Sequence, residues 1–119
     1  MASRGVLFAS RVFRWAAIYG VIVLAPLYLL PLPSVEPQNR LGFIGTALAF
    51  QWVFWLIGGD PVRFRALMLP AVAEKLVFSV PVMVFVAKGM TPKPVAGFAA
   101  IDIGLAVAFF AAWRRITPS

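Results

Sequence analysis

Glu74 and Lys75 are adjacent charged residues inside an apolar run that extends from residue 61 to residue 87. A charge in the middle of a membrane span costs a few kcal/mol on insertion scales, so such residues are usually paired and often functional. Neighbouring residues on a helix point about 100° apart, so these two side chains need partners on other helices. This run therefore holds the first candidate site.

Other apolar runs contain the polar residues that could serve as partners. Lys75 is expected to pair with Asp102, the anion available in the last apolar run. Glu74 is expected to accept a hydrogen bond from Gln51, Tyr19 or an interfacial arginine. If no donor is within reach, Glu74 is expected to be protonated, because burial disfavours a carboxylate.

The depths of these residues suggest a single site. At 1.5 Å of rise per residue, Gln51 lies about 10 Å, the Glu74–Lys75 pair about 12–14 Å and Asp102 about 16 Å from one membrane face. The predicted buried polar cluster comprises Gln51, Glu74, Lys75 and Asp102, bordered by Tyr19 and Ser79. Three uses remain open: a structural latch between two helices, a proton- or cation-responsive site, or contact of one charge with another subunit.

The composition is that of a membrane protein. Hydrophobic residues make up 62% of the 119 residues and charged residues 13%, against about 45–50% and about 25% in soluble domains. The absence of cysteine excludes thiolate metal sites and disulfides, and the absence of histidine removes the commonest metal ligand and general base. We expect no metal, no cofactor and no catalytic residue. The net charge of +7 gathers at the ends of apolar runs, which indicates membrane topology rather than nucleic-acid binding.

The apolar runs predict an all-α, four-transmembrane-helix bundle that forms a single integral membrane domain over residues 1–119. Helices are expected at about residues 12–32, 41–58, 61–87 and 95–113, each long enough to cross the hydrocarbon core. The basic start followed by an apolar run resembles a signal peptide, but its length of about 18 residues favours an uncleaved signal-anchor.

The second and third helices are predicted to form a tight antiparallel hairpin. Gly58 and Gly59 are expected to cap the second helix, and Asp60 followed by proline is a helix start signal. The tip of this hairpin carries Arg63 and Arg65. Pro70 and Pro81 are expected to interrupt the third helix, each by removing one backbone hydrogen bond.

Basic residues favour an orientation with both termini inside the cell. One side would receive seven of them: Arg4, Arg11, Arg14, Arg63, Arg65, Arg114 and Arg115. The other side would receive Arg40, Lys88 and Lys93. Because positive residues concentrate on the cytoplasmic side, we expect an N-in, C-in, multi-pass membrane protein.

Small residues form one face of the fourth helix, at Gly97, Ala100, Gly104, Ala108 and Ala111. Small residues at such spacing let helix backbones approach closely. Gly97, Gly104 and Ala108 are therefore candidate helix-packing positions, on the face opposite Asp102. A homo-oligomer, a larger membrane complex or a lipid-sized groove would use this face. An alanine-rich helix also produces such stripes by chance.

The most distinctive segment of the sequence is Asp60-Pro-Val-Arg-Phe-Arg-Ala-Leu-Met-Leu-Pro-Ala-Val-Ala-Glu-Lys75, with Gln51-Trp52 before it and Ile101-Asp102 after it. It resembles a family of small four-span bacterial inner-membrane proteins that has no established reaction. The resemblance covers helices two to four. It implies a four-helix, multi-pass protein of the bacterial inner (plasma) membrane and adds no catalytic residues.

The sequence favours a non-enzymatic membrane protein, either an accessory subunit or a bundle that binds a small ligand or lipid through the buried cluster. A proton-coupled transporter acting as an oligomer is one alternative. A membrane-embedded, lipid-modifying enzyme with Glu74 and Asp102 as acid and base is another. The enzyme is the weakest of the three, because no nucleophile, metal set or cofactor motif accompanies the carboxylates.

Overall fold

The computed structural model describes residues 3–30 and 36–116, which form an all-helical protein. Its elements are α1 (Arg4–Leu29), α2 (Pro37–Gly59), the 3-10 helix η1 (Arg65–Leu67), α3 (Met68–Ala87) and α4 (Lys93–Arg115). Four segments are long and apolar enough to cross a membrane: α1, α2, α4, and α3 together with η1. The predicted helical class and the four candidate spans are confirmed.

Helix α1 begins at Arg4, well before the predicted start near residue 12. The hydroxyl of Ser3 accepts a hydrogen bond of 3.1 Å from the backbone N–H of Val6 and so caps the helix. The first proline of α1 is Pro26, which itself lies inside the helix. The basic segment that precedes the apolar run is therefore a continuous part of α1.

The connection between α2 and α3 is longer than predicted. Asp60 ends α2, and its carbonyl accepts a hydrogen bond of 3.1 Å from the N–H of Phe64, which closes a turn. Because α3 begins only at Met68, Pro70 lies in its first turn, where a missing N–H breaks no helical hydrogen bond. Only Pro81 interrupts α3. The prediction that Pro70 also does so is wrong.

Gly58 and Gly59 belong to α2 and do not cap it through a left-handed conformation. Among the described residues only Gly89, with a φ of 74°, has a positive φ. The two glycines instead let α1 approach, because a Cβ on Gly58 would lie 2.7 Å from Cγ of Arg14. The Arg14 guanidinium in turn lies 3.7 Å from the centre of the Trp55 ring.

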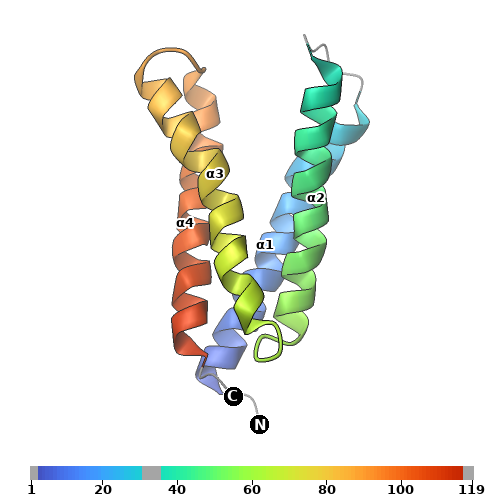
Figure 1. Ribbon diagram of the computed structural model, residues 1–119, viewed down its shortest axis with the longest axis vertical. Coiled ribbons are helices and arrows are strands. Elements are labelled where there is room, and N and C mark those ends of the chain that lie inside the picture. Colours follow the sequence, from blue (N-terminus) through green and yellow to red (C-terminus); the bar gives the residue numbers. More distant parts are fainter. Residues whose placement is uncertain (1–2, 31–35, 117–119) are drawn as a thin grey trace.

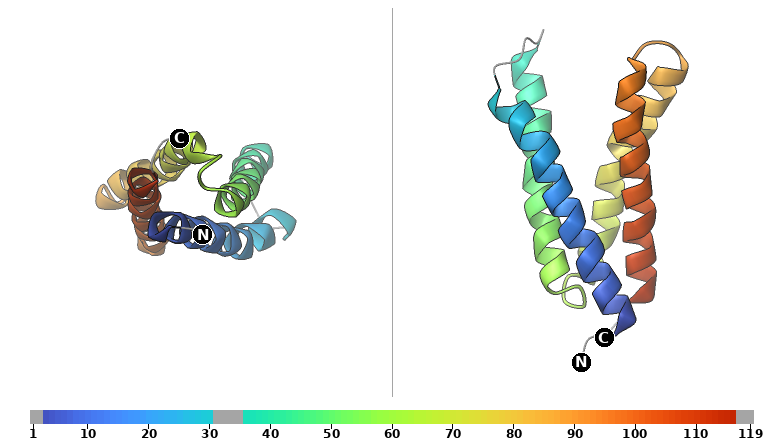
Figure 2. Two further views of the ribbon diagram at one scale, coloured as in Figure 1. Left: turned by 90° about the horizontal axis from the view of Figure 1, so that it is seen from below. Right: turned by 180° about the vertical axis from the view of Figure 1, so that it is seen from behind.

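The four helices form two hairpins arranged as a V (Figure 1). Helix α1 packs along α2, α3 packs along α4, and α1 also contacts α4, whereas α2 and α3 barely touch. The hairpins meet at the end where α1 begins and α4 ends, here called the narrow end, and diverge toward the wide end (Figure 2). The predicted tight hairpin of α2 with α3 is therefore wrong.

The core lies where α1, α2 and α4 converge. The rings of Phe13, Phe54 and Phe109 are fully buried, with Phe13 stacked on Phe109 at 4.2 Å and Phe54 at 5.0 Å from Phe109. The outer surface is apolar as well, since Trp15 is 69% and Val107 65% exposed. Such a surface suits contact with lipid chains rather than water.

Candidate functional site

A cavity of about 980 Å³ lies between the two hairpins. Residues from all four helices line it, most of them apolar, and its volume is at the upper end of the range for ligand pockets. Its charged lining residues are Arg40, Glu74, Lys75 and Asp102. The divergence of α2 and α3 thus creates a space whose wall carries the predicted buried charges.

Three of these charges form one cluster across α3 and α4. The ammonium of Lys75 lies 3.6 Å from Oδ1 of Asp102, its predicted partner, and 3.7 Å from Oε2 of Glu74. The same ammonium lies 5.1 Å from the centre of the Phe54 ring on α2. The cluster therefore joins the two hairpins through a cation–π contact as well as joining α3 to α4.

Glu74 departs from its expected surroundings. We expected its partner to be Gln51, Tyr19 or an arginine, but its carboxylate reaches its own neighbour, Lys75. Although adjacent residues leave the helix in different directions, the long, flexible lysine stem brings the ammonium between both carboxylates. Oε2 of Glu74 has no hydrogen-bond partner among the described residues.

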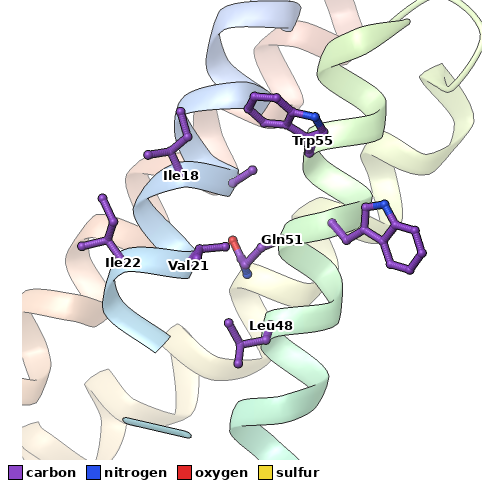
Figure 3. Close-up of a pocket in the computed structure, with 8 residues that line it drawn as sticks. Ile18, Val21, Ile22, Leu48, Gln51 and Trp55 are labelled. Atoms are coloured by element: carbon purple, nitrogen blue, oxygen red, sulfur yellow. The ribbon is translucent and has the colours of Figure 1, made fainter. Parts of the chain in front are cut away.

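Gln51 lines the same cavity but turns toward α1 (Figure 3). Its Nε2 donates a hydrogen bond of 2.6 Å to the carbonyl of Ala47, and its Oε1 has no partner within the described residues. The side chain is accommodated by Gly20 on α1, where any Cβ would overlap the Gln51 amide. Gln51 is therefore held by its own helix and is not bonded to the charged cluster.

The two border residues have different positions. Tyr19 is half-buried and lines the cavity together with the cluster. Ser79 is fully buried, and its hydroxyl donates a hydrogen bond of 2.8 Å to the carbonyl of Lys75. A serine in an apolar helix commonly bonds the carbonyl four residues earlier. Ser79 thus supports the backbone of α3 and does not line the cavity.

Toward the wide end, side chains from opposite walls approach each other. The rings of Phe43 on α2 and Phe78 on α3 lie 5.8 Å apart, centre to centre. Arg40, near the start of α2, donates a hydrogen bond of 2.8 Å to the carbonyl of Leu27, which ties it to the end of α1. The cavity therefore has a charged cluster on one wall and an aromatic contact across it.

The polar residues of the α2–α3 connection lie away from the cavity. Nε of Arg65 donates a hydrogen bond of 3.1 Å to the carbonyl of Trp113, and its guanidinium lies 4.4 Å from the centre of that ring. The N–H of Arg63 lies 3.4 Å from Oδ1 of Asp60. These contacts fasten the narrow end and supply no ligand-binding group.

In the part of the chain that the structure describes, the glycines on the predicted packing face of α4 contact no other helix. A Cβ on Gly97 or Gly104 would meet no atom within 4 Å, and Ala108 is only half-buried. The opposite face, which carries Ala106, Phe109 and Ala112, packs into the core. Close packing at Gly97 and Gly104 would therefore need a neighbour other than the described helices.

A second hollow, of about 410 Å³, lies on the α1–α2 pair (Figure 3). Its walls are apolar, with Ile18, Ile22, Trp52 and Trp55 among them, and Gln51 lies at its base. It holds no charged residue. It is suited to a hydrocarbon chain and offers no group for acid–base chemistry.

The chemistry open to the central cavity is ion pairing, proton binding and apolar contact. Within residues 3–30 and 36–116, no group of three or more His, Cys, Asp or Glu side chains is placed to hold a metal ion. Neither carboxylate is paired with a nucleophile.

Three residues that shape this site were not predicted from the sequence. Gly20 makes room for Gln51, Phe54 lies against the Lys75 ammonium, and Arg40 lines the wide part of the cavity. A glycine inside an apolar span is a usable signal, because it often marks close helix approach. Phe54 gave no signal, since it is one of 11 phenylalanines.

Comparison with known proteins adds no relative. No family model, no curated protein and no solved structure matches the chain.

Proposed function

We propose that this chain is a membrane-embedded binding protein whose ligand is a small amphipathic molecule held between the two hairpins. The cavity of about 980 Å³, with apolar walls and a charged cluster on one of them, is the observation that carries the proposal. Ligand sites combine a mainly apolar lining with a few placed polar groups. The lipid bilayer supplies a route for such a molecule, because α2 and α3 barely touch.

The host membrane in this proposal is the inner (plasma) membrane of a bacterium, with both termini in the cytoplasm. The start of α1, the 60–67 connection and the end of α4 all lie at the narrow end (Figure 1). Seven of the eleven basic residues belong to these segments. Positive residues favour the cytoplasmic side, so the cavity widens toward the opposite face.

A test of binding uses two matched glycines. Gly42 lines the cavity and Gly97 lies outside it, and a Cβ at either would meet no atom of a described residue within 4 Å. The tagged protein would be purified from its native membrane in mild detergent and analysed by native mass spectrometry. We expect a bound small molecule or lipid with wild type and with Gly97→Trp, and its loss with Gly42→Trp, which fills the cavity. Equal retention by both variants would contradict the proposal.

A proton-coupled transporter that acts as an oligomer is the second candidate. The open space beside Gly97 and Gly104 favours it, because small residues on an outward face permit close contact with another helix. The same face would serve an accessory subunit in a larger complex. Purification distinguishes these outcomes: a second copy gives a multiple of the chain mass, and an accessory subunit co-purifies with a different protein at fixed stoichiometry.

A further inference from the structure

We infer that the ligand of the central cavity is a lipophilic organic cation with one positive charge, whose charged group lies against Glu74 and Asp102. The inference rests on the proposed function, because it names the class of ligand for the same cavity. Three observations support it: the net charge of the Glu74–Lys75–Asp102 cluster, the exposure of each of these side chains, and the residue types that line the cavity.

The cluster carries one negative charge in excess when its members are ionised. Two carboxylates face the single ammonium of Lys75, at 3.7 and 3.6 Å. Arg40 lines the same cavity but lies fourteen residues before Phe54, whose ring contacts that ammonium, or about 21 Å along α2. Arg40 is therefore too distant to balance the cluster locally.

The accessible side of the cluster is anionic. The Lys75 side chain is 5% exposed, whereas those of Glu74 and Asp102 are 17% and 18% exposed. A molecule in the cavity thus meets carboxylate oxygens, while the ammonium lies behind them against an aromatic ring. An anionic or phosphate-bearing group at this position would face repulsion.

The carboxylates retain binding capacity. Both distances to Lys75 exceed the 2.7–2.9 Å that is typical of charge-assisted hydrogen bonds. Oε2 of Glu74 has no hydrogen-bond partner among the described residues. A buried acceptor of this kind is normally satisfied, and the positive charge of a bound cation would stabilise it.

The remaining walls suit a cation with an apolar body. Tyr19, Phe50, Phe78 and Phe98 line the cavity, and aromatic faces attract cations. The depth of the cluster also excludes the amine of a phospholipid whose phosphate is held at Arg40. The two sites are about 21 Å apart along the helix, whereas a headgroup amine is only a few bonds from its phosphate.

The test compares two ions of nearly the same shape and opposite charge. Radiolabelled tetraphenylphosphonium would be bound to the purified protein in detergent, with unlabelled tetraphenylphosphonium or tetraphenylborate as competitor. We expect saturable binding that only the cation displaces. Glu74→Gln and Asp102→Asn, which each remove the excess negative charge, should weaken it at least tenfold. Gly97→Ala, outside the cavity, should leave it unchanged.

A double variant keeps the test decisive if a single variant fails to fold. Lys75→Met with Asp102→Asn retains one net negative charge through Glu74, so its affinity should stay within a few-fold of wild type. Displacement by tetraphenylborate, or wild-type affinity in Glu74→Gln, would overturn the inference and leave the proposed function standing. Absence of saturable cation binding to wild type would also overturn it, and the Gly42→Trp comparison would still decide the proposed function.

Discussion

Lys75 is the residue whose replacement tests the cluster most directly. In Lys75→Met, two carboxylates would remain near each other without their cation, inside a largely apolar wall. Removing one partner of a buried ion pair is strongly destabilising, so we expect a loss of about 3 kcal/mol, at the low end of the known range because both carboxylates are partly exposed. Thermal unfolding in detergent measures it.

The second step of that experiment neutralises the partner. Adding Asp102→Asn removes one uncompensated charge, so the double variant should recover part of the lost stability. A double variant no more stable than Lys75→Met would mean that the Lys75–Asp102 contact contributes nothing to folding.

Gly20 is predicted to be sensitive to a single methyl group. A Cβ at this position would overlap the Gln51 amide, so Gly20→Ala must displace Gln51 or push α1 from α2, at a cost of about 1–3 kcal/mol. Adding Gln51→Ala makes room and should restore stability. Gly104→Ala is the control, since its Cβ would meet nothing within 4 Å. Unfolding temperatures that fall equally in Gly20→Ala and Gly104→Ala would contradict the packing argument.

For individual residues, the sequence predicted the pairing of Lys75 with Asp102, because a charge in an apolar span needs a partner and few partners were available. It did not predict that Glu74 would share that ammonium, or that Gln51 would bond to Ala47. Those outcomes depend on rotamers of long side chains, and the position of a residue along a helix does not determine them.

Among the elements, η1 is expected to be held in place by one side chain, that of Arg65. Arg65 donates a hydrogen bond to the Trp113 carbonyl and lies over its ring, so it fastens the α2–α3 connection to the end of α4. Arg65→Ala should lower stability by about 1–2 kcal/mol. Arg63→Ala removes the same charge from an exposed site whose ring contact is to adjacent Phe64, and should be near neutral. Chemical unfolding of both variants checks the difference, and equal effects would refute it.

The helices themselves were largely predictable, and their packing was not. Continuous apolar runs separated by Pro and Gly clusters give four spans, because each feature acts locally. The starts of α1 and α3 were misplaced, since Ser3 caps the first helix and the turn at Asp60 delays the third. The divergence of α2 from α3 depends on contacts between distant residues such as Phe13 and Phe109, for which the sequence carries no local signal.

For the whole molecule, the proposed orientation rests on the basic residues at the narrow end. A phosphatase reporter fused after Ser119 should be inactive, because we propose that the C-terminus is cytoplasmic. The same reporter inserted after Gly89, in the α3–α4 connection, should be active. The reverse pattern would place the wide end of the cavity on the cytoplasmic side. Activity at both sites would contradict the four-span topology.

Entry to the cavity is expected to pass between α2 and α3, where the rings of Phe43 and Phe78 lie close together. Phe43 and Phe78 face each other across it at 5.8 Å, and the chain contains no cysteine. The pair Phe43→Cys and Phe78→Cys can therefore be joined by a short bifunctional thiol reagent without a competing site. We expect the joined protein to lose its co-purifying molecule several-fold more slowly during detergent washing, as measured by mass spectrometry. Each single-cysteine variant, treated identically, controls for the loss of one ring. Equal release from joined and unjoined protein would place the exit route elsewhere than between α2 and α3.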